Sequence, residues 1–371
     1  MRAISRAILY SDLLSLKKIQ EIPQYFKQPS YQQVLEQLQS LDETDLARQV
    51  AIIQGSFSAR VAQATNEETQ PWQGESTEIL SAEELIVEAK AIANELESRA
   101  IQDSDGSLNW IGMGFVPEAE RYQLQLLDDS LYDGRCGVAL FLAALYQVTG
   151  DPRYSDLSLR VLQSLRQRLK TLDLESQRRF ARLTGLGGAT GLGSIIYALV
   201  KIGQFLGDET LLTEARVLAD SIAPEMIAAD QQLDIISGAA GTILGLLSLY
   251  QVTHEVSILE TAIACGQHLL DQQVRVNGAP KAWRTFNERP LTGFSHGAAG
   301  IAYALLRLYN ATQEQNYLEA ALEGIEYERS VFSEKHTNWP DLRSFEGRDP
   351  GFLVQWCHGA AGIGLGRLGS G

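Results

Sequence analysis

Five stretches of the chain repeat one arrangement, a Gly-x-x-Gly turn followed by a run of apolar residues. The leading glycines are Gly134, Gly188, Gly238, Gly297 and Gly359, so successive copies begin 54, 50, 59 and 62 residues apart. Each run is apolar on all sides, as in "SGAAGTILGLLSLY", which is typical of a helix buried all round. Five copies at near-even spacing indicate a repeat architecture.

Charged, amphipathic stretches separate these apolar runs, and the clearest cover residues 155–170, 211–226 and 317–332. Alternating β-branched runs with hairpin turns are scarce, so the pattern predicts few strands. The repeat unit is therefore an outer helix, a loop and an inner helix, and the expected fold class is all-α. Small residues at the start of each inner helix allow close approach, which favours closure into an α/α toroid over an open solenoid.

The first part of the chain lacks the repeat. Residues 1–64 are expected to form several short helices, of which the segment 31–64 is the most strongly patterned. The polar, acidic stretch "TNEETQPWQGESTE" at 65–78 is the best candidate for a linker. The repeats then place a toroid domain at residues 79–371.

Composition narrows the class of protein and its partners. With 45% hydrophobic and 21% charged residues, the chain can bury a sizeable core. A formal net charge of −15 argues against nucleic acid or an anionic membrane surface as a partner. No apolar run approaches the ~18 residues that a membrane span needs. Three widely spaced cysteines fit a reducing compartment, so we expect a cytoplasmic protein.

The residue before each leading glycine stands close to the start of an inner helix. Asp133, Gly187 and Ser237 are ordinary residues for such a position, because they cap the free N–H groups or leave them open. His296 and His358 depart from this rule in the last two repeats. Departures from local structural rules are expected at functional sites.

Cys357 stands directly before His358. If the inner helices of a ring begin at one common mouth, His296, Cys357 and His358 converge there, and the positive helix ends favour a thiolate and neutral histidines. The structural alternatives are a histidine that satisfies a loop carbonyl and a cysteine that packs as a small apolar residue. The residues alone leave both open, whereas Cys136 and Cys265 are expected to be core residues.

Asp234 lies four residues ahead of Gly238 in an otherwise apolar approach to its turn. Its carboxylate either caps the turn or orients a histidine across the mouth. A toroid enzyme that acts on carbohydrates with two carboxylates is a further alternative, but the repeat turns carry no well-placed carboxylate pair.

Three motifs, "LYDGRCGVALFLAAL", "LTGFSHGAAGIAYALLRLY" and "WCHGAAGIGLGRL", occur in this order and resemble the cyclase region of class II lanthionine synthetases. The resemblance extends to residues 1–64, which are similar to the connection between the dehydratase part and the cyclase. It implies an α/α toroid and a zinc-dependent addition of peptide cysteine thiols to dehydroalanine or dehydrobutyrine, which forms the thioether rings of a lanthipeptide. The implied partner is a dehydrated precursor peptide.

Carried over by position, the resemblance implies that His296 is the acid/base residue, Asp234 its partner and Cys357 the first of three zinc ligands, with His358 a weaker candidate. A later Cys-His pair has no counterpart, so we expect five modules of six and an incomplete toroid at 79–371. Zinc binding and independent activity are then expected to be weak or absent, and a separate dehydratase or a further C-terminal segment would be needed. The alternative is a non-catalytic module that binds a precursor peptide or a partner protein.

Overall fold

The computed structural model describes most of the chain in two compact units. One unit comprises Met1–Gln73 and Met113–Gln125, and the other comprises Gly74–Gly112 and Leu126–Gly371. The expected linker at 65–78 lies outside the described residues. The described residues are 6–10, 19–23, 28–64, 80–116, 121–275, 278–285, 289–343 and 350–368.

The first unit contains a strand pair and two helices. Its elements are β1 (Arg6–Tyr10), β2 (Ile19–Pro23), α1 (Ser30–Ser40) and α2 (Glu43–Ala64). The strands are antiparallel, with Arg6 opposite Pro23. Helix α2 carries Glu43 and Asp45 in its first turn, where acidic side chains interact favourably with the positive end of the helix dipole. The expectation of helices alone over residues 1–64 is therefore wrong at the two strands.

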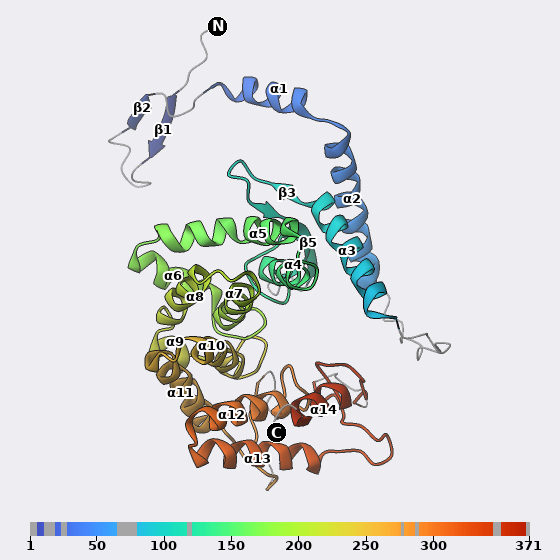
Figure 1. Ribbon diagram of the computed structural model, residues 1–371, viewed down its shortest axis with the longest axis vertical. Coiled ribbons are helices and arrows are strands. Elements are labelled where there is room, and N and C mark those ends of the chain that lie inside the picture. The colour runs from blue at the N-terminus through green and yellow to red at the C-terminus, as the bar shows by residue number, and fades with distance from the viewer. Residues whose placement is uncertain are drawn as a thin grey trace. The chain divides into compact units, whose positions relative to one another are not determined.

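The second unit consists of paired helices (Figure 1). Its inner helices are α4 (Arg135–Thr149), α7 (Leu192–Leu206), α10 (Ala239–Thr253), α12 (Ala298–Thr312) and α14 (Ala360–Leu368). Its outer helices are α5 (Pro152–Thr171), α8 (Thr210–Asp220), α11 (Val256–Asp271) and α13 (Gln315–Ser330). Shorter or flanking elements are α3 (Ala82–Arg99), β3 (Ile101–Gln102), β4 (Leu108–Asn109), α6 (Leu174–Thr184) and α9 (Pro224–Ala228). A further pair, β5 (Ile111–Val116) and β6 (Arg121–Leu126), contributes residues to both units.

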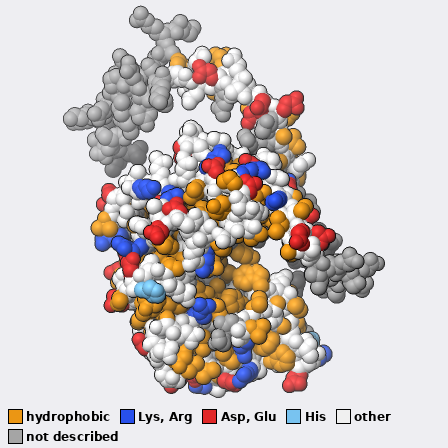
Figure 2. Space-filling view, viewed as in Figure 1, with side chains coloured by type: hydrophobic (Ala, Val, Ile, Leu, Met, Phe, Trp, Pro, Cys, Tyr) orange, Lys and Arg blue, Asp and Glu red, His pale blue; other side chains and the backbone are white. Residues whose placement is uncertain are grey.

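Each of the first four inner helices packs on the outer helix that follows it and on the next inner helix. Figure 1 shows the inner helices succeeding one another from green to red, with the outer helices around them. Within the described residues, strands occur only in two-stranded sheets. The all-α class and the α/α toroid are therefore confirmed. In Figure 2, hydrophobic side chains gather on the middle of the visible face, in the region of the inner helices.

The predicted outer helices match the observed ones with one exception. The stretch at 211–226 is interrupted, because α8 ends at Asp220 and α9 begins at Pro224. Proline has no backbone N–H to donate and its ring clashes with the preceding turn, so a helix cannot run through it unbroken. The stretch at 211–226 thus forms most of helix α8 and part of the separate short helix α9.

Glycine caps the N-terminus of the first four inner helices, but the second repeat was misaligned in the sequence. The N-cap residues are Gly134, Gly191, Gly238 and Gly297, all with extended backbone. The leading glycine of the second repeat is therefore Gly191, three residues after the predicted Gly188. Residues 185–193 contain five glycines, and Gly188 begins a Gly-x-x-Gly sequence whereas Gly191 does not, so the motif pointed to the wrong glycine.

The five turns that precede the inner helices form a continuous rim. Backbone hydrogen bonds join each turn to the next, from Tyr132 N to Ala189 O (3.0 Å), Ala189 N to Ile236 O (3.1 Å), Ile235 N to Ser295 O (3.1 Å) and Ser295 N to Cys357 O (3.3 Å). The rings of Tyr132 and Trp356, from the first and fifth turns, lie 5.7 Å apart between centroids. Side chains of the first and fifth turns therefore contact each other.

Glycines also bring α7 and α10 into backbone contact. A Cβ atom placed on Gly245 would lie 2.8 Å from the Cα atom and the carbonyl carbon of Gly193, and closer still to its carbonyl oxygen. A Cβ atom on Gly193 would lie 2.8 Å from the Cα atom of Thr242. Only residues without a side chain permit this approach, as the small-residue pattern predicted.

Candidate functional site

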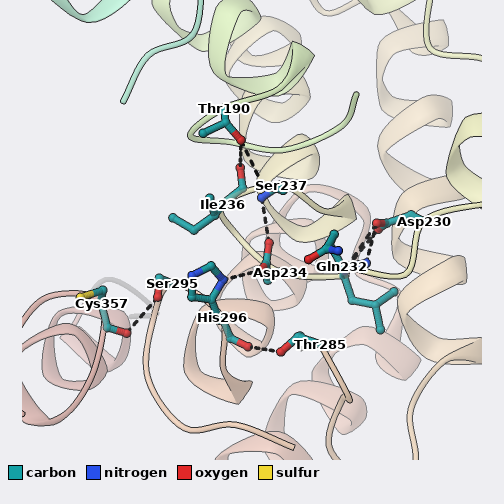
Figure 3. A network of polar contacts seen from close by, with 11 residues as sticks. Thr190, Asp230, Gln232, Asp234, Ile236, Ser237, Thr285, Ser295, His296 and Cys357 are labelled. Carbon is teal, nitrogen blue, oxygen red and sulfur yellow. Dashed lines mark hydrogen bonds and ion pairs between the residues drawn. The ribbon is translucent and has the colours of Figure 1, made fainter. Parts of the chain in front are cut away.

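His296 and Asp234 meet across two neighbouring turns of the rim (Figure 3). Asp234 precedes α10 and is fully buried, and its Oδ2 lies 2.6 Å from Nδ1 of His296, in the turn before α12. The side chain of His296 keeps 19% of its surface exposed. A carboxylate at Nδ1 favours the tautomer with the proton on that nitrogen.

Asp234 makes both of the contacts considered from the sequence, one within its own turn and one to a histidine. Its Oδ1 accepts a hydrogen bond from the backbone N–H of Ser237 (2.8 Å), which stabilises the turn, while Oδ2 contacts His296. The ring is also held through its backbone, because Thr285 Oγ1 donates to the carbonyl of His296 (2.7 Å). The geometry therefore fixes both the position and the orientation of the imidazole.

A second aspartate, Asp230, builds the turn that carries Asp234. It accepts backbone hydrogen bonds from Gln232 (2.9 Å) and from Ala239 (2.8 Å), the first residue of α10. Burial raises the pKa of Asp230 above its ordinary value. The sequence reasoning missed Asp230, because it stands eight residues ahead of the N-cap Gly238 and gives no capping signal.

A buried glutamate, Glu328 of α13, holds the turn that carries His296. Its Oε1 accepts from the backbone N–H groups of Gly293 and Ala299, each at 3.1 Å, and its Oε2 lies 3.2 Å from Nη2 of Arg367 on α14. Burial raises the pKa of Glu328 to about 7, against the opposing effect of these donors. Glu328 thus joins the start of α12 to α14, and sequence analysis gave no sign of it.

Cys357 and His358 lie in the fifth turn, beside the fourth. The carbonyl of Cys357 accepts from Ser295 N, and its partly exposed thiol lies 3.4 Å from Oε1 of Gln355. The ring of His358 is buried, with its centroid 6.0 Å from that of His296. The structure therefore brings together all four residues that the sequence singled out.

An arginine and an aspartate complete this side of the site. Nε of Arg343 lies 3.0 Å from Oδ1 of Asp341, and its Nη2 lies 2.6 Å from Oδ2. The two residues therefore form a bidentate ion pair. Burial and the positive charge of Arg343 lower the pKa of His358 to about 4, although Asp341 opposes this shift. His358 is therefore neutral at physiological pH. The hydrogen bond to Asp341 raises the pKa of Arg343 above its ordinary value, and the nearby Cys357 adds a smaller contribution in the same direction.

The other two cysteines are core residues. Cys136 and Cys265 are both fully buried, and all three cysteines of the chain are unpaired. Burial raises the pKa of the Cys265 thiol to about 12 and raises that of Cys136 as well. Neither thiol is therefore ionised near neutral pH, which leaves Cys357 as the candidate metal ligand.

The described residues do not by themselves fit a catalytic zinc ion. No group of three or more His, Cys, Asp or Glu side chains in the described part of the chain is arranged to hold a metal. Cys357 and His358 offer two ligands at most, whereas catalytic zinc takes three protein ligands and keeps one position open.

Residues 125–371, more than half of the chain, match the sequence profile of the family described as lanthionine synthetase C-like protein. The chain belongs to this family. The resemblance to the cyclase region of lanthionine synthetases, drawn from the three turn motifs, is thereby confirmed. The match begins shortly before α4 and spans all five turns of the rim.

Similar proteins include longer chains. The Lacticin 481/lactococcin biosynthesis protein LcnDR2 of Lactococcus lactis subsp. lactis is 23% identical over 293 residues, which cover 78% of this chain and 28% of the relative. The LanC-like protein GCL1 of Arabidopsis thaliana is 26% identical over 253 residues, covering 65% and 54%. A nisin cyclase structure matches with a TM-score of 0.49 and 18% identity, over 65% of each chain. The chain thus spans about half or less of the two sequence relatives.

None of the helices in the described residues combines the length and apolar character that a membrane crossing requires.

Proposed function

We propose that the chain is the cyclase region of a lanthionine synthetase and that its substrate is a dehydrated precursor peptide. The reaction is the addition of a peptide cysteine thiol to dehydroalanine or dehydrobutyrine. The sulfur bonds to the β-carbon of the double bond, the π electrons move to the α-carbon and its carbonyl, and the resulting enolate takes a proton at the α-carbon. The thiol loses one proton and the α-carbon gains one, so the product has the mass of the reactant.

The observation that carries the proposal is the His296–Asp234 pair on the rim, at 2.6 Å. A histidine held by a buried carboxylate is suited to proton transfer, because the carboxylate orients the ring and stabilises its charged form. We assign the proton transfers of the reaction to Nε2 of His296. The guanidinium of Arg343 adds a positive charge on the same side, where an anionic enolate or thiolate forms.

Zinc is part of the proposal through Cys357, which we assign as a ligand, with His358 as a weaker candidate. Because the described residues supply two ligands at most, we expect the purified chain to hold well under one zinc per molecule. Metal analysis by atomic absorption after dialysis tests this, and a stoichiometry near one would contradict it.

The chain is therefore expected to close rings slowly, with the proton-transfer pair in place and the metal site incomplete. The test uses a synthetic peptide that contains one cysteine and one dehydroalanine, with free thiol followed over time and the product mass checked. Thiol loss should exceed the uncatalysed rate, and His296→Ala should lower the excess rate about 10²-fold or more. Asp234→Asn should also lower it, because the ring loses its orienting carboxylate.

His254→Asn is the matched control, since His254 caps the opposite end of α10 and asparagine tolerates its left-handed backbone. It should leave the rate unchanged. Equal rates for the wild type, the His296→Ala variant and peptide alone would refute the catalytic role.

A non-catalytic peptide-binding module of the same fold is the second candidate. The incomplete ligand set in the described residues favours it. Such a module would bind the dehydrated peptide and leave its thiol unreacted. A separate dehydratase or a further C-terminal segment would serve as the partner in either case. The unpaired state of all three cysteines supports a cytoplasmic location for both candidates.

A further inference from the structure

A cavity of about 400 Å³ lies between the inner faces of α7, α10 and α12. At one end it is lined by Ile235, the neighbour of Asp234 in the rim, and at the other by Lys201 and Arg307. The function proposed above uses only the rim end of this space. The inner end carries polar groups that the ring-closing chemistry does not require.

The polar groups at the inner end occupy equivalent positions of the repeat. Counted from the N-cap glycine, the tenth residue of each helix is Lys201 in α7, Ser248 in α10 and Arg307 in α12. At 1.5 Å per residue, this layer lies about 15 Å along the helices from the rim. The sixth residues, Tyr197 and Tyr303, form the layer above it on α7 and α12.

The two cations have no carboxylate partner within the described part of the chain. Nζ of Lys201 donates to Oε1 of Gln204 (3.2 Å), and Nη1 of Arg307 donates to the hydroxyl of Tyr303 (2.9 Å). Each cation also lies 5.8 Å from the ring centroid of the tyrosine one turn before it, Tyr197 or Tyr303. The chain as a whole has a net charge of −15, whereas these two cations make the cavity locally positive.

Ser248 completes this layer. It is 8% exposed, and its hydroxyl has no hydrogen-bond partner among the described residues. A buried hydroxyl without a partner is unfavourable unless something else satisfies it. Ser248 lines the cavity, and rotation of its side chain toward an acceptor there would satisfy the hydroxyl.

A structural role at the helix ends does not account for these cations. A basic side chain stabilises a helix through its dipole when it lies in the last turn. The last turns of α7 and α12 contain no basic residue, because Lys201 and Arg307 lie further from the ends. The equivalent position of α4 is Ala144, so the repeat itself does not require a charge there.

We propose that this cavity binds an acidic side chain of the peptide substrate, with its carboxylate between Lys201 and Arg307 and the hydroxyl of Ser248 as a further donor. The site rests on the proposed function for its peptide and adds a specificity rule to it. An extended peptide advances about 3.3 Å per residue, so 15 Å corresponds to four or five residues. The acidic residue should therefore stand four or five positions from the residue that reacts beside His296.

The test compares two fluorescein-labelled peptides, acetyl-Leu-Glu-Glu-Leu-amide and its Gln-Gln analogue, binding to the full chain by fluorescence anisotropy. The Glu peptide should bind about tenfold more tightly or better, although the net charge of the chain repels it. Lys201→Gln and Arg307→Gln should each weaken the Glu peptide about tenfold and leave the Gln peptide almost unchanged. Lys201→Arg, which keeps the charge, should retain most of the affinity.

Two matched controls remove a cation elsewhere, Lys90→Gln on α3 and Arg182→Gln on α6. Both residues are exposed, and these variants should bind as the wild type does. Equal binding of the two peptides, or equal losses in cavity and control variants, would overturn the proposal. Circular dichroism of each variant shows whether it is folded, and Lys201→Arg keeps the test valid if a glutamine variant is not.

Free glutamate at the peptide's concentration separates a peptide site from a site for small carboxylates. It should not displace the labelled Glu peptide, and full displacement would overturn the assignment to a peptide. Peptide discrimination without thiol loss would contradict only the cyclase activity. Thiol loss that depends on His296, with no discrimination between the peptides, would contradict only the acidic subsite.

Discussion

Replacing Gly245 by alanine is expected to destabilise the second unit by about 2 kcal/mol. The new Cβ would lie 2.8 Å from the Cα atom and carbonyl carbon of Gly193, and nearer still to its carbonyl oxygen. All three atoms belong to the backbone, so no side chain can rotate away and α7 must move from α10. Overpacking of this kind costs typically 1–3 kcal/mol, and the upper end applies to a rigid contact. The higher helix propensity of alanine returns about 1 kcal/mol.

Urea unfolding followed by circular dichroism measures this change, with Gly364→Ala as the matched control. Gly364 lies within α14, and a Cβ atom there would meet no atom within 4 Å. The control variant should therefore gain about 0.5–1 kcal/mol from helix propensity alone. The same substitution is thus expected to have opposite signs at the two positions. Equal stabilisation by both would refute the inference that α7 and α10 meet backbone to backbone.

Two further predictions concern titration and reactivity. Burial raises the pKa of Glu328 from its ordinary 4.5 to about 7, so the folded state holds a proton that the unfolded state has released between these pH values. As pH rises from 4.5 to 7, the free energy of unfolding of the wild type should fall by about 3 kcal/mol relative to that of Glu328→Gln. Equal pH dependence of the two free energies would contradict this prediction. In native protein, a thiol reagent should modify Cys357 quickly, and Cys136 and Cys265 only after unfolding, because the two buried thiols are neither ionised nor accessible. A fast phase that survives Cys357→Ser would show this view of the core to be wrong.

The helical pairs were predictable because each inner helix carries a turn signal and an apolar run. The contact of His296 with Asp234 was also anticipated, through the family resemblance and the idea of a shared mouth. Both inferences depend on repetition, which places equivalent residues at equivalent points of a ring. Their catalytic roles remain predictions.

The remaining features have no repeat signal. Asp341 and Arg343 stand in an irregular segment, where neither period nor capping marks a residue as part of the site. In the sequence, Glu328 cannot be distinguished from the other acidic residues of a charged outer helix. Its burial depends on the packing of α12 and α14, which the sequence pattern does not indicate. The layer of Lys201 and Arg307 becomes visible only when the second repeat is aligned on the correct glycine.

Backbone hydrogen bonds join the turns of the rim directly. The geometry of the site therefore does not depend on how many residues lie between one turn and the next. The inner helices begin at Arg135, Leu192, Ala239, Ala298 and Ala360, so the intervals are 57, 47, 59 and 62 residues. These unequal lengths are absorbed by the outer helices and loops, while a backbone hydrogen bond still joins each turn to the next. Insertions between the turns are therefore expected to leave the contact of His296 with Asp234 unchanged. A single residue inserted within a turn would instead change the neighbours of His296 and disconnect it from Asp234.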